Sequence, residues 1–193
     1  MNMIRAFIAL DLATEVLQRL EEVNRQLRQC LPGSAVRWVA VKNIHLTLKF
    51  LGEVSEANLP VLYEITRKEA EKQAPFEIRI SGLGAFPSVN RPRVIWVGIQ
   101  APPDLAAVQH AIDTETARVG YASEERDFSP HLTLGRIARN ASPEETRQIT
   151  GNLSVLKVGD LGASRIQAIH FYRSDLTPQG SIYTRLYSAP LKP

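Results

Sequence analysis

The tetrapeptide His-Leu-Thr-Leu occurs twice in this chain, at residues 45–48 and again at residues 131–134. The chain has four histidines and therefore six histidine pairs, and the chance that any pair shares its next three residues is on the order of one in a thousand. We therefore expect the repeat to have a structural or chemical cause. Two equivalent strands in a duplicated fold would supply one.

The segments around the two motifs follow the same order, a strand, a helix and then the motif strand. Arg5 and Arg93 begin similar apolar strands 88 residues apart (93 − 5 = 88), and the motif histidines are 86 residues apart (131 − 45 = 86). This layout indicates an internal duplication. We predict a single body over residues 1–193 with two lobes, built from approximately 1–90 and 91–193, between which strands could be exchanged.

The apolar pattern predicts an α+β fold of two antiparallel-type sheets with helices on their outer faces. We expect helices at about 14–29, 55–73, 104–119 and 143–152. Strands are expected at 5–10, 36–39, 44–51, 76–80, 93–99, 131–137, 165–173 and 181–188, and residues 82–92 are expected to form a loop.

Alternate residues of a strand share a face, so the His and Thr of each motif point one way and the two leucines point the other way. The leucines are expected in the core. A pseudo-twofold axis between the lobes would bring both His and both Thr to one cleft from opposite sides. Because histidine titrates near neutrality, one imidazole can accept a proton while the other donates one. The pattern favours acid–base catalysis at phosphorus.

Two alternatives compete with this interpretation. Each His could be a hydrogen-bonded strand residue without a chemical role, but the duplication and the Thr on the same face argue against this. A metal site is the second alternative, yet two histidines without an obvious third ligand make a poor zinc site. The single cysteine, Cys30, excludes an intrachain disulfide and a cysteine-based zinc site.

Composition and motifs exclude several other classes. The net charge of +3 is spread evenly and does not by itself argue for nucleic acid. The apolar run at residues 6–10 is too short for a secretory or membrane-spanning segment, which favours a cytoplasmic protein without a membrane partner. The chain has no P-loop, which argues against a ligase driven by a nucleoside triphosphate.

We expect structural rather than catalytic roles for the two other histidines and the two tryptophans. His110 is expected on a helix surface, and His170 is expected to be structural, with the rim of the cleft as its alternative. Trp38 and Trp96 are expected in the core, although Trp38 or the neighbouring Arg37 could contact RNA.

Three stretches resemble a known family: Arg-Ala-Phe-Ile-Ala-Leu-Asp at 5–11, His-Leu-Thr-Leu-Lys-Phe-Leu-Gly at 45–52 and Phe-Ser-Pro-His-Leu-Thr-Leu-Gly-Arg at 128–136. The chain resembles the two-histidine phosphoesterases, most closely the RNA 2′,3′-cyclic phosphodiesterases once described as 2′-5′ RNA ligases. The resemblance covers nearly the whole chain. It implies a bilobal fold with a central cleft, no cofactor, and metal-independent opening of a 2′,3′-cyclic phosphate to a 2′-phosphate.

The resemblance also implies roles for individual residues. His45 would be the general acid and His131 the general base, while Thr47 and Thr133 would bind phosphate oxygens. The two motifs are identical, so the residues alone do not say which His is the acid.

The family further suggests that Phe50 stacks on the terminal base and that Arg136 contacts a phosphate. Strand alternation predicts otherwise, because each lies five residues after its motif His and an odd offset belongs to the leucine face. Phe50 would then be a core aromatic and Arg136 an outward arginine, unless the strand bends. Gly135 would permit such a bend.

The expected partner is an RNA with a 2′,3′-cyclic phosphate end or a small cyclic nucleotide, and no obligate protein partner is evident. Two alternative functions remain at this level. One is the reverse reaction, 2′-5′ ligation of ends like those of tRNA halves. The other is a non-catalytic RNA- or nucleotide-binding module, against which the two intact motifs argue.

Overall fold

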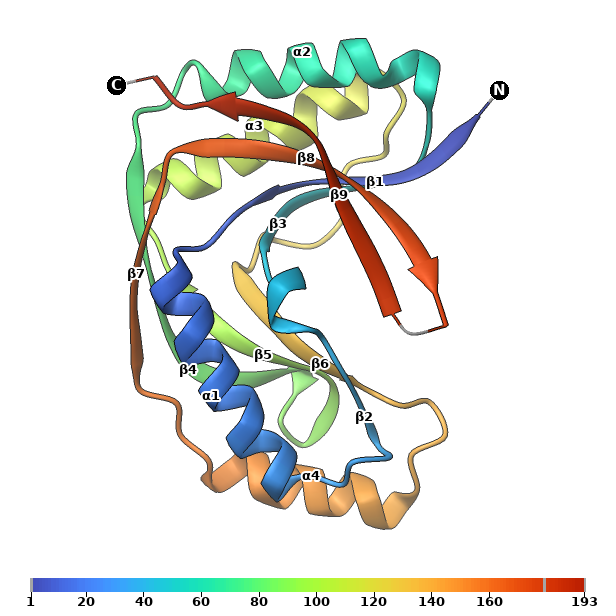
Figure 1. The fold of residues 1–193 in the computed structure, drawn as a ribbon, viewed down its shortest axis with the longest axis vertical. Coiled ribbons are helices and arrows are strands. Elements are labelled where there is room, and N and C mark those ends of the chain that lie inside the picture. Colours follow the sequence, from blue (N-terminus) through green and yellow to red (C-terminus); the bar gives the residue numbers. More distant parts are fainter. Residues whose placement is uncertain (1, 179, 193) are drawn as a thin grey trace.

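Two antiparallel sheets lie between two layers of helices in the computed structural model, which describes residues 2–178 and 180–192 (Figure 1). The first sheet has the strand order β3-β1-β8-β9, with β1 Met3–Leu10, β3 Leu46–Ser55, β8 Ala168–Thr177 and β9 Gly180–Pro190. The second sheet has the order β2-β6-β5-β4-β7, with β2 Val36–Trp38, β4 Phe76–Ser88, β5 Arg91–Gln100, β6 His131–Ile137 and β7 Asp160–Ile166. Each sheet therefore draws strands from both halves of the chain.

Each sheet is covered by helices on one face only (Figure 1). The first sheet packs against α2 Leu59–Ala70 and α3 Pro103–Arg118, and the second against α1 Thr14–Cys30 and α4 Pro143–Val155. Two short 3₁₀ helices, η1 Val41–Asn43 and η2 Glu56–Asn58, flank β3. No helix within the described residues has the length and apolar character needed to span a membrane.

The helices cross between the sheets, because α1 follows β1 of the first sheet but packs on the second. The helix α3 makes the reciprocal crossing, since it follows β5 of the second sheet and packs against β3 of the first. The two sheets are thereby interlocked through the chain, and their uncovered faces are turned toward each other across the middle of the molecule (Figure 1).

The motif leucines lie in the core, as the alternation of the motifs predicts. Leu46, Leu48, Leu132 and Leu134 are each at most 3% exposed and face the helices. Burial of this apolar surface on the helix side fixes which face of each motif strand remains for the His and Thr.

The prediction of a loop at residues 82–92 is wrong, because β4 and β5 form a hairpin that continues through most of this segment. Gly82 has φ +77° and lies at a bulge between Ser81 and Leu83, so the strand continues beyond it. Gly84 is required for close packing: a Cβ there would lie 2.3 Å from the indole of Trp96. These glycines are therefore strand residues rather than turn residues.

The strand expected at 165–173 is in fact two strands in different sheets. Residues 160–166 form β7 at the edge of the second sheet, and after Gln167 the chain enters β8 of the first sheet. Both strands carry buried side chains, so the apolar pattern runs through the crossing point without interruption.

Candidate active site

The two motif histidines are held by the same hydrogen bond. The Nδ1 atom of His45 lies 2.7 Å from the carbonyl oxygen of Asn43, and the Nδ1 atom of His131 lies 2.7 Å from that of Ser129. A carbonyl oxygen only accepts, so each Nδ1 carries the hydrogen and donates it. The Nε2 atom of each ring is therefore the nitrogen left for chemistry.

A β-bulge lies at the fourth residue of the first motif. In the pairing of β3 with β1, Thr47 lies opposite Ala9 and Lys49 lies opposite Ile8, so Leu48 is the extra residue. Paired residues of an antiparallel ladder share a face. Phe50, opposite Phe7, therefore lies on the face of Thr47 and not on that of the leucines.

The second motif has a bulge at the equivalent residue. In the pairing of β6 with β5, Thr133 lies opposite Trp96 and Gly135 lies opposite Ile95, so Leu134 is the extra residue. Arg136, opposite Val94, consequently shares the face of Thr133. The bend is at Leu134, one residue before the glycine that the sequence suggested.

The two bulges overturn the alternation argument for both residues five positions after a motif His. Phe50 is 57% exposed and Arg136 is also exposed, so Phe50 is not a core aromatic. Thr133 and Arg136 lie opposite residues two apart on β5, which places them about 7 Å apart along the strand. Each motif strand thus presents His, Thr and one further residue of its own on the uncovered face, Phe50 on the first sheet and Arg136 on the second.

Aromatic rings hold each imidazole in place. His45 stacks on Phe7 with ring centroids 4.6 Å apart, and the ring of Tyr183 meets it edge-on at 5.2 Å. His131 meets Phe86 edge-on at 4.8 Å. Trp96, expected in the core, lies on this same face beside His131 at 6.4 Å between ring centroids.

The chain itself brings the two motifs together. The backbone N–H of Val39, just after β2, donates to the carbonyl of Leu134 in the second motif. Six residues later the chain reaches His45 of the first motif (45 − 39 = 6). The side-chain amide of Asn43, between them, donates to the carbonyl of Ser181 in β9 and ties this connection to the first sheet.

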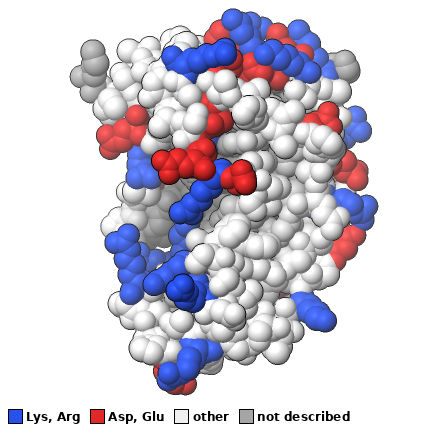
Figure 2. All heavy atoms as spheres, turned by 180° about the vertical axis from the view of Figure 1, so that it is seen from behind, with Lys and Arg blue, Asp and Glu red and all other residues white. Residues whose placement is uncertain are grey.

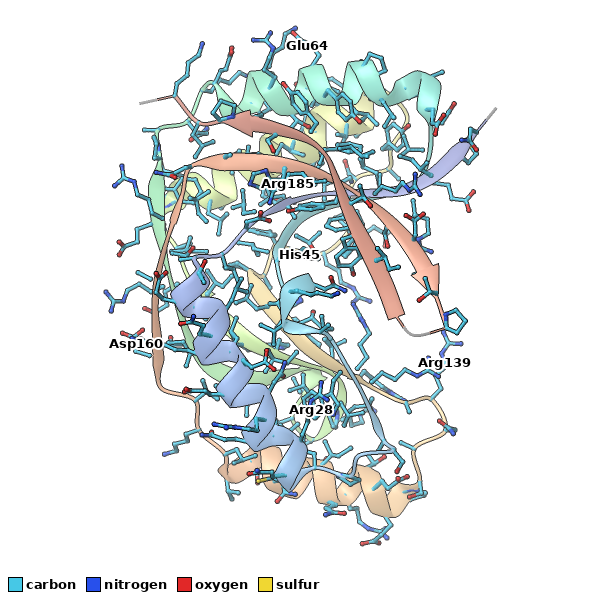
Figure 3. All side chains as sticks on the ribbon, viewed as in Figure 1. Arg28, His45, Glu64, Arg139, Asp160 and Arg185 are labelled. Atoms are coloured by element: carbon cyan, nitrogen blue, oxygen red, sulfur yellow. The ribbon has the colours of Figure 1, made fainter. Side chains whose placement is uncertain are left out.

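The cleft between the two uncovered faces opens on the surface of the molecule. His45 lies between the sheets in Figure 3. Figure 2 shows a hollow at mid-height of one face, with Lys and Arg side chains beside and below it and Asp and Glu side chains above it. The basic side chains on its lower side suit an anionic ligand.

A polar cluster on the first sheet was not anticipated from the sequence. The hydroxyl of Tyr172 donates to Asp11 at 2.7 Å, and Arg185 pairs with the same carboxylate. Burial and the hydrogen bond to Asp11 raise the pKa of Tyr172 to about 12. His170, 3.6 Å from Asp11, joins this cluster on the same face as Phe7 and is nearly buried, while Ser188 contacts its Nδ1 atom.

The charges near the two motif histidines differ in sign. Burial lowers the pKa of His45, but the Asn43 carbonyl and the negative charge of Asp11 both act to raise it. Burial also lowers the pKa of His131, and there the positive charge of Arg136 adds to the effect while the Ser129 carbonyl opposes it. Burial is the largest effect at both rings and lowers both pKa values, while the nearby charges act in opposite directions: Asp11 favours a proton on His45 and Arg136 disfavours one on His131.

His110 and Trp38, the remaining candidates from the sequence, lie away from the uncovered faces. His110 is exposed on α3, and Trp38 packs on the helix side of β2 under the guanidinium of Arg28. Within residues 2–178 and 180–192, no three His, Cys, Asp or Glu side chains are grouped as metal ligands would be.

Comparison with known proteins finds relatives over nearly the whole chain. The model of the LigT like phosphoesterase family matches residues 10–96. The chain is 34% identical over 181 residues to the RNA 2′,3′-cyclic phosphodiesterase of Methanothermobacter thermautotrophicus, an alignment that covers 94% of this chain and 95% of that protein. The chain belongs to the LigT-like phosphoesterase family. A second member, the RNA 2′,3′-cyclic phosphodiesterase of Archaeoglobus fulgidus, is 31% identical over 94% of this chain and 97% of its own length.

Solved structures of the family share the fold over the full chain. A protein of Thermus thermophilus superposes with a TM-score of 0.79 at 27% identity, over 97% of this chain and 98% of its own. LigT of E. coli in complex with 3′-AMP superposes with a TM-score of 0.78 at 26% identity, over 100% of both chains. The α+β fold of two antiparallel sheets is that of the family.

Proposed function

We propose that this chain hydrolyses 2′,3′-cyclic phosphate ends of RNA to 2′-phosphates, without a metal ion, by an acid–base pair of histidines. The observation that carries the proposal is the pair of equivalent Nε2 atoms, each fixed by an Nδ1–carbonyl hydrogen bond, on two uncovered faces that are turned toward each other. The names of the relatives support the same reaction.

In this reaction His131 is the base and His45 is the acid. Nε2 of His131 takes a proton from water as its oxygen attacks phosphorus, and Nε2 of His45 gives a proton to the 3′ oxygen as the P–O3′ bond breaks. The nearby charges support this assignment, because the base must begin neutral beside Arg136 and the acid must begin protonated within the field of Asp11.

The neighbouring side chains bind the substrate. The hydroxyls of Thr47 and Thr133 each lie on the face of a motif His and donate to the non-bridging oxygens of the phosphate. Phe50 offers an exposed ring to the terminal base, and Arg136 offers a guanidinium to phosphate. A Phe on one face and an Arg on the other give the ribose a preferred orientation in an otherwise pseudo-symmetric cleft.

The direct test uses an oligonucleotide with a 2′,3′-cyclic phosphate end, incubated with the enzyme in EDTA. We expect full turnover and a product that is exclusively the 2′-phosphate, because water held by His131 must attack in line with the departing 3′ oxygen. Phosphorus NMR distinguishes the two monoesters. A 3′-phosphate would reverse the acid and base roles, and loss of turnover restored by zinc or manganese would contradict metal independence.

The pH dependence tests the two roles separately. We expect a bell-shaped profile of kcat/KM with its maximum below about pH 6.5, since burial places both histidine pKa values below the usual one. The rate rises with pH as His131 loses its proton, and it falls as His45 loses its proton. Asp11→Asn removes a charge that raises the pKa of His45, so the alkaline limb should move to lower pH.

Asp175→Asn is the matched control for the pH experiment, because Asp175 lies on β8 of the same sheet and pairs with Arg173 rather than with the Asp11 cluster. Its profile should overlay that of the wild type. An alkaline limb that stays in place or moves to higher pH in Asp11→Asn would contradict the assignment of His45 as the acid.

A further inference from the structure

Two arginines lie directly opposite each other at the edge of the second sheet. Arg37 of β2 pairs with Arg136 of β6, and both side chains are exposed. Paired residues share a face, so Arg37 lies on the face that carries Thr133 and His131. Its neighbours Val36 and Trp38 occupy the opposite, helix-covered face.

This pairing costs stability unless an anion lies between the two side chains. Like charges directly opposite on neighbouring strands are destabilising. In the part of the chain that the structure describes, no ion pair joins either guanidinium to a carboxylate. The positive charge of Arg136 also reaches far enough to lower the pKa of His131.

The strand that carries Arg37 has no counterpart in the first sheet. The order β3-β1-β8-β9 of the first sheet corresponds to β6-β5-β4-β7 of the second, and β2 is an additional strand beside β6. The cleft is therefore extended on one side only, next to the second motif. An RNA chain that extends from the catalytic phosphate along this side of the cleft would contact Arg136 first and then Arg37.

We propose that Arg37 and Arg136 form a second phosphate subsite, which binds the phosphodiester that precedes the terminal nucleotide. The proposal rests on the proposed function, and it makes an RNA chain, rather than a cyclic mononucleotide, the preferred substrate. Arginine suits this role because its planar guanidinium binds two phosphate oxygens at once. Arg37 touches no reacting atom and contributes only to binding.

The decisive comparison uses two dinucleotides with the same bases and the same 2′,3′-cyclic phosphate end. One has a phosphodiester linkage and the other an uncharged methylphosphonate linkage. We expect the wild-type enzyme to prefer the phosphodiester by about tenfold or more in kcat/KM, the effect of one hydrogen bond to a charged group. Arg37→Ala should reduce this preference to nearly one, and Arg37→Lys should retain part of it.

Arg147→Ala is the matched control, because Arg147 is an exposed arginine on α4, which packs on the same sheet, and its ion pair within the described residues is with Glu144. It should keep the wild-type preference. Thermal unfolding adds a second readout: Arg37→Ala should unfold at an unchanged or higher temperature, because it removes a like-charge contact. A fall in that temperature would indicate a structural role for Arg37 and would contradict the subsite.

Binding of the same dinucleotides to the His45→Ala variant separates this inference from the proposed function. A preference for the phosphodiester in binding, with no turnover by wild type, would reject the proposed function alone. Turnover by wild type without such a preference, or a preference that survives in Arg37→Ala, would reject the subsite alone.

Discussion

Replacing His45 or His131 with alanine is expected to lower kcat by about 10²- to 10⁴-fold on an oligonucleotide with a cyclic phosphate end, because each change removes one positioned proton-transfer group. Both rings lie on the uncovered faces, whereas the leucines of the same motifs fill the core. The fold should therefore survive either change. Initial rates and thermal unfolding, measured on the same preparations, separate lost catalysis from lost structure.

His110→Ala is the control for the histidine variants, since His110 is exposed on α3 and faces neither motif. Its rate should equal that of the wild type. Thr47→Ala and Thr133→Ala should cost less than either histidine variant, because one hydroxyl supplies only part of the stabilisation of the phosphate. Turnover within a few-fold of wild type in either histidine variant would contradict the paired-imidazole mechanism.

The faces of the motif strands could be predicted from the sequence only as far as the fourth motif residue. The alternation His, Leu, Thr, Leu places the histidines and the buried leucines correctly. Gly135 permits a bend in the second motif strand, but the pattern marks neither Leu48 nor Leu134 as an extra residue, because a bulge depends on the pairing with the neighbouring strand. Phe50 and Arg136 therefore lie on the opposite face from the one that simple alternation predicts.

The partition of strands between the sheets was likewise beyond the sequence. Periodicity recognises a strand from local burial, but the partner of a strand depends on contacts far along the chain. Residues 160–177 show this, because a continuous pattern crosses from one sheet to the other at Gln167. The sequence does not show the polar cluster for the same reason, since pairing across β1, β8 and β9 brings together Asp11, Tyr172 and Arg185.

The bulge at Leu48 also turns Lys49 into the core, where its side chain is 1% exposed. Its Nζ atom lies 2.5 Å from Asp113 on α3 and 2.5 Å from the carbonyl oxygen of Ala122. Asp113 also accepts a hydrogen bond from the backbone N–H of Glu124. The pair thus joins the first motif strand to the segment that leads into the second motif.

Lys49→Ala is expected to lower the free energy of unfolding by about 3–5 kcal/mol, because it leaves the carboxylate of Asp113 buried without its partner. Denaturant unfolding measures the change. The exposed pair of Arg147 and Glu144 supplies the control, and Arg147→Ala should cost no more than about 1 kcal/mol. A cost below about 1 kcal/mol for Lys49→Ala would contradict a buried ion pair.

The pH dependence of stability tests the same ion pair, Lys49 with Asp113. Burial alone would raise the pKa of Asp113, but the hydrogen bonds from Lys49 and the Glu124 amide outweigh it and hold the pKa below its usual value. A carboxylate with a lowered pKa stabilises the fold above its unfolded pKa of about 3.9, and this stability is lost as the pH falls toward the lower folded value. Between pH 5 and pH 3, a range of about two units around that pKa, Lys49→Ala should therefore lose less stability than the wild type.

The double variant Lys49→Met/Asp113→Leu separates the unpaired charge from lost packing. Well-packed apolar residues often replace a buried ion pair at little cost, so the double variant should regain most of the stability that Lys49→Ala loses. It cannot, however, donate to the Ala122 carbonyl or accept from the Glu124 amide. Because that segment leads into His131, we expect the double variant to be stable but slower, with a lower kcat. Equal kcat in the double variant and the wild type would show that the ion pair serves stability alone.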